Sequence, residues 1–339
     1  MKKLRVLALV HDHLVPPDDT TGIDVLEAEW KMEYDVIETL REMGHEVRVL
    51  GIHDDLGGIR PNAGHFKPHV VFNLMEAFAD VTTFDQNVVS YLELLHLPYT
   101  GCNPRGLILA RDKALSKKLL AYHRIKVPEF LVVRPGRKVA LPKRLGFPLI
   151  VKSLFFEASA GISQASVVEN EEQLARRAAF IHEKLGTAAI AEQFIDGREL
   201  YVGVLGNERL EAFTPWEMSF AGTQDNTWRI ATERVKWSTK YQKRHGIMTD
   251  RAQLDAADLD RLQRIARRTY RALDLNGYAR VDFRMSADGE VYVLEANPNP
   301  NLAYGEDFSE SAESAGTSYE HLLERIIALG RRWEPARTG

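Results

Sequence analysis

The sequence has little cysteine and no long apolar run. Cys102 is the one cysteine among 339 residues, which rules out a disulfide within the chain and favours a reducing compartment. The first apolar stretch, LRVLALV, is too short to span a membrane, and the polar residues after it do not resemble a signal-peptide cleavage region. The sequence therefore predicts a cytoplasmic protein that does not associate with membranes.

The sequence also has no block of basic residues and no internal repeat. Its formal net charge is −4, so we do not expect a basic surface for nucleic acid. Hydrophobic residues make up 45% of the chain and charged residues 27%, as in ordinary globular proteins. A chain of this length usually forms two or three packed units. These properties are those of an intracellular chain of enzyme size, and they still allow phosphate chemistry.

The first hundred residues alternate between strand and helix patterns. Apolar stretches predict strands near residues 4–10, 47–50 and 70–74, and apolar periodicity predicts helices over residues 25–43 and 86–97. Strands separated by helices predict a parallel sheet covered on both faces, and therefore an α/β fold.

Two histidines follow the first predicted strand. Ligands of parallel α/β sheets gather beyond the carboxyl ends of the strands, so His11 and His13 lie in an expected cleft. Three interpretations stay open: substrate contact, an ordinary loop surface, or a metal pair, for which the sequence offers no further obvious ligands.

One lysine ends a short buried strand in the middle of the chain. Lys152 closes the stretch FPLIVKS, where a cation needs an anion such as a nucleotide phosphate, unless the position is simply at the surface. The loop after it, EASAGIS, contains Ser159 and Gly161, and its backbone N–H groups could cover phosphates as a lid.

The stretch EQFIDGRE joins two predicted strands. Glu192 and Glu199 flank the bend between them. The backbone of such a bend could contact a flat base while a carboxylate contacts ribose hydroxyls.

The stretch YARVDFRMSADGEVYVLEAN predicts a hairpin, because Asp-Gly between alternating runs is a strong turn signal. A turn centred on residues 286–289 places Arg280 opposite Glu295 and Asp282 opposite Val293. Alternation then puts four polar residues on one face: Arg280, Asp282, Glu295 and Asn297. The opposite face, with Val281, Phe283, Met285, Tyr292, Leu294 and Ala296, is predicted to be core.

The polar face of this hairpin has the ligand chemistry of magnesium. Carboxylate and amide oxygens suit Mg²⁺ bound together with substrate phosphates, whereas zinc prefers histidine or cysteine. An exposed face with salt bridges is the alternative interpretation. Pro298 and Pro300 prevent the strand from continuing its ladder, so the strand is expected to end at the site.

Taken together, these segments resemble the ATP-grasp superfamily, and within it the D-alanine:D-alanine ligases. The resemblance runs from about residue 70 to the end of the hairpin and is carried by ordered motifs: PYTGCNPRGLILARDKALSKKLL, FPLIVKS, EASAGIS, EQFIDGRELYVGVLG and ARVDFRMSADGEVYVLEANPNPN. Their order and spacing are more specific than any one motif alone.

The resemblance implies roles for individual residues. Lys113 and Lys152 would bind phosphates, Glu192 and Ile195 would meet adenine, and Glu199 would hold ribose. Asp282, Glu295 and Asn297 would bind two Mg²⁺ ions, with Mn²⁺ as an alternative. Arg280 would stabilise the transition state, and Lys236 would approach the γ-phosphate from a long loop.

The resemblance also implies an architecture and a reaction. The expected units are an N-terminal α/β domain over residues 1–102, a small ATP-grasp subdomain over residues 103–193 and a C-terminal subdomain over residues 194–335. ATP would phosphorylate a substrate carboxylate, and an amine would attack the acyl phosphate to form an amide, with release of ADP and phosphate. The resemblance further suggests a homodimer.

Two departures from the family pattern lie on the substrate side. The family has a glycine-rich loop with serine and glutamate near its N-terminus, where this chain has VHDHLVPPDDTTG. Asn301 stands where the family has a glycine, and Glu306 follows in a loop that could face a cationic acceptor or could be solvated. We therefore expect substrates other than two D-alanines. A regulatory nucleotide-binding protein and an ATP-grasp enzyme of the kinase or carboxylase type are the alternatives.

Overall fold

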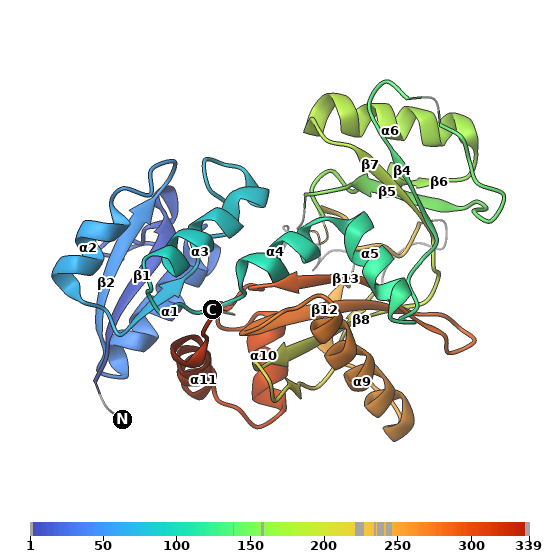
Figure 1. The fold of residues 1–339 in the computed structure, drawn as a ribbon. Helices are drawn as coiled ribbons and strands as arrows, with labels where there is room; N and C mark the ends of the chain where they lie inside the picture. Colours follow the sequence, from blue (N-terminus) through green and yellow to red (C-terminus); the bar gives the residue numbers. More distant parts are fainter. Residues whose placement is uncertain are drawn as a thin grey trace.

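The computed structural model describes residues 3–137, 139–156, 159–220, 227–233, 235, 241 and 246–335. Its elements form three sheets with helices packed against them (Figure 1). Within the described residues, none of the helices combines the length and the apolar character that crossing a membrane requires.

The N-terminal sheet is parallel and has the order β2-β1-β3. Its strands are β1 (Arg5–His11), β2 (Glu46–Ile52) and β3 (Val70–Asn73), and its helices are α1 (Lys31–Glu42), α2 (Ile59–Phe66) and α3 (Asp85–Leu94). Residues of α1 share a core with one face of β1, and residues of α2 and α3 share a core with the other face. The predicted parallel sheet with helices on both faces is confirmed.

The helix predicted over residues 25–43 is shorter than expected. Asp24 caps a separate turn of 3-10 helix, Val25–Glu27, by accepting a hydrogen bond from the backbone of Leu26. Ala28 then adopts an extended conformation, so α1 begins only at Lys31. Further short 3-10 turns occur at Asp12–Leu14, Thr82–Phe84 and Gln164–Ser166.

The second sheet is small and antiparallel, with the order β4-β7-β5-β6. It consists of β4 (Phe130–Val133), β5 (Leu149–Ser153), β6 (Val167–Val168) and β7 (Ala189–Gln193). Helix α6 (Glu171–Leu185) covers it, because Leu174, Ala178 and Ile181 recur on one face of the helix and pack against this sheet.

The third sheet is antiparallel and has the order β11-β10-β8-β12-β13, with β9 beside β8. Its strands are β8 (Arg198–Leu205), β9 (Glu211–Ala212), β10 (Trp216–Ser219), β11 (Met248–Arg251), β12 (Tyr278–Met285) and β13 (Val291–Pro298). The helices around it are α4 (Pro104–Arg111), α5 (Lys113–Tyr122), α9 (Ala256–Ala272), α10 (Asp307–Ser314) and α11 (Tyr319–Arg332). Residues of α4, α5 and α9 share one core with this sheet, whereas Phe308 and Ala312 of α10 belong to a separate core.

The N-terminal unit contacts the third sheet at a close backbone approach. Gly277, just before β12, has a φ of +73°, and a Cβ at this position would lie 2.6 Å from the carbonyl oxygen of Gly101. Only glycine accommodates both the positive φ and the close contact with Gly101. Gly277 therefore allows the N-terminal unit to pack against the start of β12. Helix α11 returns to this unit and packs near α1 and β3.

Candidate functional site

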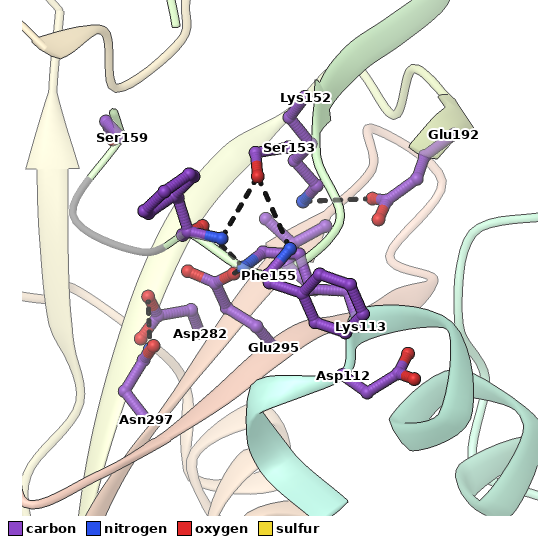
Figure 2. A network of polar contacts seen from close by, with 12 residues as sticks. Asp112, Lys113, Lys152, Ser153, Phe155, Ser159, Glu192, Asp282, Glu295 and Asn297 are labelled. Carbon is purple, nitrogen blue, oxygen red and sulfur yellow. Dashed lines mark hydrogen bonds and ion pairs between the residues drawn. The ribbon is translucent and has the colours of Figure 1, made fainter. Parts of the chain in front are cut away.

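A pocket lies between the second and third sheets. Its lining includes residues of α5, β5, β7, β8, β12 and β13. Many of the residues predicted from the sequence line it: Lys113, Lys152, Ser159, Glu192, Ile195, Glu199, Asp282 and Glu295. Figure 2 shows Lys113 and Lys152 near the carboxylates of Asp282 and Glu295.

Lys152 is held by a buried carboxylate. It lies near the end of β5, and its Nζ is 3.1 Å from Oε2 of Glu192 on the neighbouring strand β7. Burial disfavours the charge of Lys152, but Glu192 and Glu295 outweigh this effect and raise its pKa. The side chain is therefore positively charged, as phosphate binding requires.

Lys117 was not predicted from the sequence, although it shares this carboxylate. Its Nζ lies 3.2 Å from Oε1 of Glu192 and also donates to the carbonyl oxygen of Leu294. Burial and the charge of Lys152 lower the pKa of Lys117 to about 8, although Glu192 opposes the shift. Nothing in the local sequence of this basic helix distinguishes Lys117 from the lysines around it.

Lys113 is the first residue of α5, directly after the residue that caps this helix. The Asp112 carboxylate accepts hydrogen bonds from the backbone N–H groups of Ala114 and Leu115, at 3.0 and 2.9 Å. The Lys113 ammonium donates to the carbonyl oxygen of Phe156 at 2.9 Å and lies 3.6 Å from Oε2 of Glu295. The cap thus fixes a buried lysine between the loop after β5 and the hairpin.

The register of the β12–β13 hairpin differs from the prediction. Arg280 pairs with Asn297, and Asp282 pairs with Glu295, which is two residues further along β13 than predicted. One residue of this shift arises at the turn, because Met285 pairs with Val291 and leaves residues 286–290 between the strands. The other arises from a bulge after Asp282, which leaves Leu294 as an extra residue on β13. The predicted pairs of Arg280 with Glu295 and of Asp282 with Val293 are therefore wrong.

The same bulge changes which residues of β13 are core. The packed residues are Val291, Val293 and Ala296, whereas Leu294 lines the pocket and Tyr292 is only partly buried. The assignment of Tyr292 and Leu294 to the core is wrong. On β12, Val281, Phe283 and Met285 are core as predicted.

The four polar residues predicted to share a face do lie together. Nε and Nη2 of Arg280 donate to the two oxygens of Asp282 at 2.8 and 3.0 Å, and Asn297 Nδ2 donates to Asp282 Oδ2 at 3.0 Å. Burial alone would lower the pKa of Arg280, but Asp282 and Asp307 outweigh it and raise that pKa. The structure thus places a fixed cation beside a carboxylate, with Glu295 paired to Asp282 across the hairpin.

Glu199, which lines the pocket from β8, is also engaged by neighbouring side chains. Its Oε2 accepts from Arg284 Nη2 at 2.5 Å, and its Oε1 accepts from the Tyr201 hydroxyl at 2.8 Å. Arg284, which the sequence did not single out, also donates to the carbonyl oxygens of Gly197 and Arg229. These contacts hold the bend that joins β7 of the second sheet to β8 of the third sheet. Glu192 and Glu199 therefore belong to different sheets.

The described part of the lid loop contacts the segment around Ala231. Ser159 Oγ donates to the carbonyl oxygen of Ala231 at 2.7 Å, and the Gly161 N–H donates to Glu233 Oε2 at 3.0 Å. Lys236 and residues 157–158 lie outside the described residues.

The residues proposed for the substrate side do not line this pocket. His11 and His13 lie at the end of β1, within 2.7 Å of each other through their Nδ1 atoms. Asn301 Oδ1 accepts a hydrogen bond from the backbone of Ala303, and Glu306 is the exposed residue that precedes α10. The structure does not bring these four residues together with the lysines.

Comparisons with known proteins agree with this geometry. The family model described as D-ala D-ala ligase C-terminus matches residues 119–328. A D-alanine--D-alanine ligase of Desulforudis audaxviator is 30% identical over 300 residues, covering 88% of this chain and 85% of the relative. An uncharacterized protein of Sinorhizobium fredii, y4sG, is 29% identical over 306 residues, covering 88% of this chain and 86% of that protein.

A solved structure has the same fold. The D-alanine--D-alanine ligase from Bacillus anthracis complexed with ATP superposes with a TM-score of 0.73 at 21% identity, covering 97% of this chain and 98% of that one. The predicted α/β ATP-grasp fold is confirmed.

Proposed function

The chain belongs to the D-alanine:D-alanine ligase family of ATP-dependent enzymes that form carbon–nitrogen bonds, and from this premise we propose that it joins a carboxylate to an amine through an acyl phosphate. We further propose that its substrates differ from two D-alanines. The observation that carries the proposal is the convergence of Lys113, Lys152, Asp282 and Glu295 in one pocket between two sheets.

In this proposal the pocket binds ATP with its phosphates beside these four residues. Lys113 and Lys152 supply positive charge to the phosphates, and Lys117 keeps Glu192 in place beside Lys152. The backbone of the bend at Ile195 contacts adenine, and Glu199, oriented by Arg284, accepts hydrogen bonds from ribose hydroxyls. Ser159 and Gly161 cover the phosphates, and Lys236 approaches the γ-phosphate.

The donor set at the hairpin fits Mg²⁺. Asp282, Glu295 and Asn297 offer oxygen ligands within one polar face. The cations nearest these carboxylates, Arg280 and Lys113, already pair with Asp282 and Glu295, so ATP adds negative charge that these pairs do not neutralise. Divalent ions bound by the three oxygen ligands would neutralise the phosphates and the charge that develops during phosphoryl transfer.

The reaction has two balanced steps. A carboxylate oxygen of the first substrate attacks the γ-phosphorus of ATP, and the bond to the β-phosphate oxygen breaks to release ADP. The amine then attacks the acyl carbon, phosphate leaves with the original carboxylate oxygen, and the amine loses a proton. Arg280, fixed by Asp282 and Asp307, stabilises the oxyanion between these bond changes.

The proposal of different substrates rests on residues outside the nucleotide pocket. The end of β1 and the turn after it hold His11, Asp12 and His13 where the family has a glycine-rich loop. Asn301, at the position of a family glycine, has a side chain that binds its own loop. The nucleotide side thus keeps the family's residue types while the substrate side differs.

The test is a trapping assay with hydroxylamine. The purified full chain is incubated with ATP, Mg²⁺ and single carboxylic acids or amino acids, D-alanine included, and phosphate and hydroxamate are both measured. We expect hydroxamate with a carboxylate other than D-alanine, because hydroxylamine captures the acyl phosphate. The Glu295→Gln variant provides the background.

Each other outcome has a defined meaning. Hydroxamate with D-alanine alone would overturn the substrate proposal but support the acyl phosphate. A stable phosphorylated product without hydroxamate would support a kinase-type reaction. Bound ATP without turnover on any acid would favour the regulatory alternative.

A further inference from the structure

Histidine and aspartate side chains gather at the carboxyl edge of the N-terminal sheet, outside the nucleotide pocket. His11 ends β1, His53 follows β2, and Asp80 lies in the loop after β3. Asp12 and His13 extend the same cluster. Because the three strands are parallel, their carboxyl ends meet at one edge and bring these residues together from distant parts of the sequence.

The Nε2 atoms of two histidines face one carboxylate. His11 Nε2 lies 3.5 Å from Asp80 Oδ1, and His53 Nε2 lies 3.4 Å from Asp80 Oδ2. His11 is only 5% exposed, and its Nε2 has no hydrogen-bond partner within the described chain. A buried polar atom without a partner is costly, so this nitrogen calls for a ligand.

The opposite nitrogens of both rings face a second carboxylate. Asp12 Oδ1 lies 2.9 Å from His11 Nδ1, and Asp12 Oδ2 lies 3.6 Å from His53 Nδ1. A carboxylate accepts hydrogen bonds and does not donate them, so Asp12 favours a proton on the Nδ1 atom of each ring, and His13 Nδ1, 2.7 Å from His11 Nδ1, can accept from the same atom. With a proton on Nδ1, the lone pair of His11 Nε2 points toward Asp80, which is another acceptor.

A cation between these acceptors resolves the conflict. A proton would give a charge-assisted hydrogen bond, for which about 2.7–2.9 Å is usual, whereas the two contacts are 3.4 and 3.5 Å. Ligand atoms about 2.0–2.1 Å from a tetrahedral zinc ion lie roughly 3.3 Å apart. The two histidine–carboxylate spacings are therefore close to those of ligands around a metal ion, and the ligand atoms of His11, His53 and Asp80 all lie within 4.8 Å of one another.

We propose that His11 Nε2, His53 Nε2 and the Asp80 carboxylate bind a divalent transition-metal ion, with zinc as the ion that fits best. Two imidazoles and one carboxylate are a donor set for such ions, and magnesium prefers oxygen ligands. Asp12 orients both rings from the other side, as carboxylates do for metal-bound histidines. His13 contacts Nδ1 of His11 and lies next to the site.

The site is open on one side. The side chains of His53 and Asp80 are 42% and 73% exposed, so solvent reaches the metal position past them. The Ala79 N–H donates to the carbonyl oxygen of His53 at 2.8 Å and ties the two loops together. Three protein ligands leave a coordination position for water or for a small molecule with a carboxylate or amine.

The test is direct metal binding by the full chain without an affinity tag. Zn²⁺ is titrated against a competing chelator in excess Mg²⁺, which occupies oxygen-ligand sites, and Co²⁺ is bound separately to record its visible spectrum. We expect one equivalent of tightly bound Zn²⁺ and the absorption of a nitrogen- and oxygen-ligated, four-coordinate Co²⁺ ion. His53→Asn and Asp80→Asn should weaken Zn²⁺ binding at least tenfold and abolish that spectrum.

The matched control is His65→Asn, an exposed histidine on α2 in the same N-terminal unit. It should bind Zn²⁺ like the unaltered chain. Asp80→Asn keeps a residue that tolerates the left-handed conformation found there, with φ of 60°, and circular dichroism checks that each variant folds. Absence of stoichiometric Zn²⁺ binding, or binding that neither site variant weakens, would overturn the proposal. Neither result depends on the ligase reaction.

Discussion

Glu295 is the residue on which the proposed phosphate chemistry depends most directly. Its carboxylate faces Lys113, and it is only partly buried, so its replacement does not open a hole in the core. Glu295→Gln should lower turnover roughly 100-fold or more, because a metal ligand and a charge are lost together.

The matched control for Glu295→Gln is Glu290→Gln, on the same hairpin, where Glu290 pairs with Lys126 at the surface. ADP release measures turnover, and thermal melting checks the fold. Turnover of Glu295→Gln equal to that of the control would remove Glu295 from the site.

Arg280 should serve the reaction more than ATP binding. It is held by Asp282 and Asp307 and lies 4.8 Å above the ring of Tyr201, so its position is fixed before a substrate arrives. Arg280→Ala should lower kcat by about 100-fold to 1,000-fold, as the loss of an oxyanion donor does.

The comparison is with the affinity for ATP, measured by calorimetry, which should change only a few-fold in Arg280→Ala. Equal losses of ATP affinity and of kcat would contradict a role in the transition state.

Glu33 makes stability depend on pH. The residue is 1% exposed on α1, and burial raises its pKa to about 8, with a further contribution from Glu76. Between pH 4.5 and 8 the unfolded chain loses this proton while the folded chain keeps it, so the free energy of unfolding falls as pH rises.

Glu33→Gln should remove this fall. The free energy of unfolding of the variant should rise relative to that of the unaltered chain by up to about 1.4 kcal/mol for each pH unit between pH 4.5 and 8. Urea unfolding at several pH values measures the difference. A difference that stays constant with pH would contradict the account.

Single residues also show where sequence reasoning stops. Lys113 and Lys152 could be singled out because they lie in motifs, but Lys117 resembled any lysine of a basic helix. Its burial depends on β13 and β7, which pack against it from far along the chain. Such contacts are not visible in the local pattern of α5.

Among the elements, α5 connects a local signal to the site. Asp112 caps it, and the first residue after the cap is Lys113. Asp112→Ala should cost about 1 kcal/mol of stability and weaken ATP binding, since the lysine loses its fixed start of helix.

Asp112→Asn keeps a capping side chain and should stay close to the unaltered chain in both respects. Chemical denaturation and calorimetry with ATP measure the two effects. Identical behaviour of the alanine and asparagine variants would show that the cap does not position Lys113.

The hairpin shows the limit of pattern reading for an element. Its existence and its polar face followed from the Asp-Gly turn and the alternation of β12. The sequence did not predict which side chains of β13 face the core. Residues 291–294 are apolar or aromatic throughout and therefore fit more than one register. The bulge at Leu294 settles the phase by bringing Glu295 and Asn297 onto the same face as Asp282.

At the scale of the whole molecule, the order of motifs predicted the fold better than any element did. Each motif contributes residues to one side of the pocket. The order of the motifs along the chain therefore predicts two sheets that face each other. The cluster around His11 was not predictable in this way. Its other members, His53 and Asp80, stand in loops without a motif, and only the parallel sheet brings them to His11.

The most direct test of the central claim follows the oxygen of the carboxylate substrate. The carboxylate identified by hydroxamate formation is labelled with ¹⁸O and converted with ATP, Mg²⁺ and its amine in unlabelled water, and the released phosphate is analysed by ³¹P NMR or mass spectrometry. An acyl phosphate predicts one ¹⁸O atom transferred to phosphate for each amide formed. Amide formation with unlabelled phosphate would contradict the account.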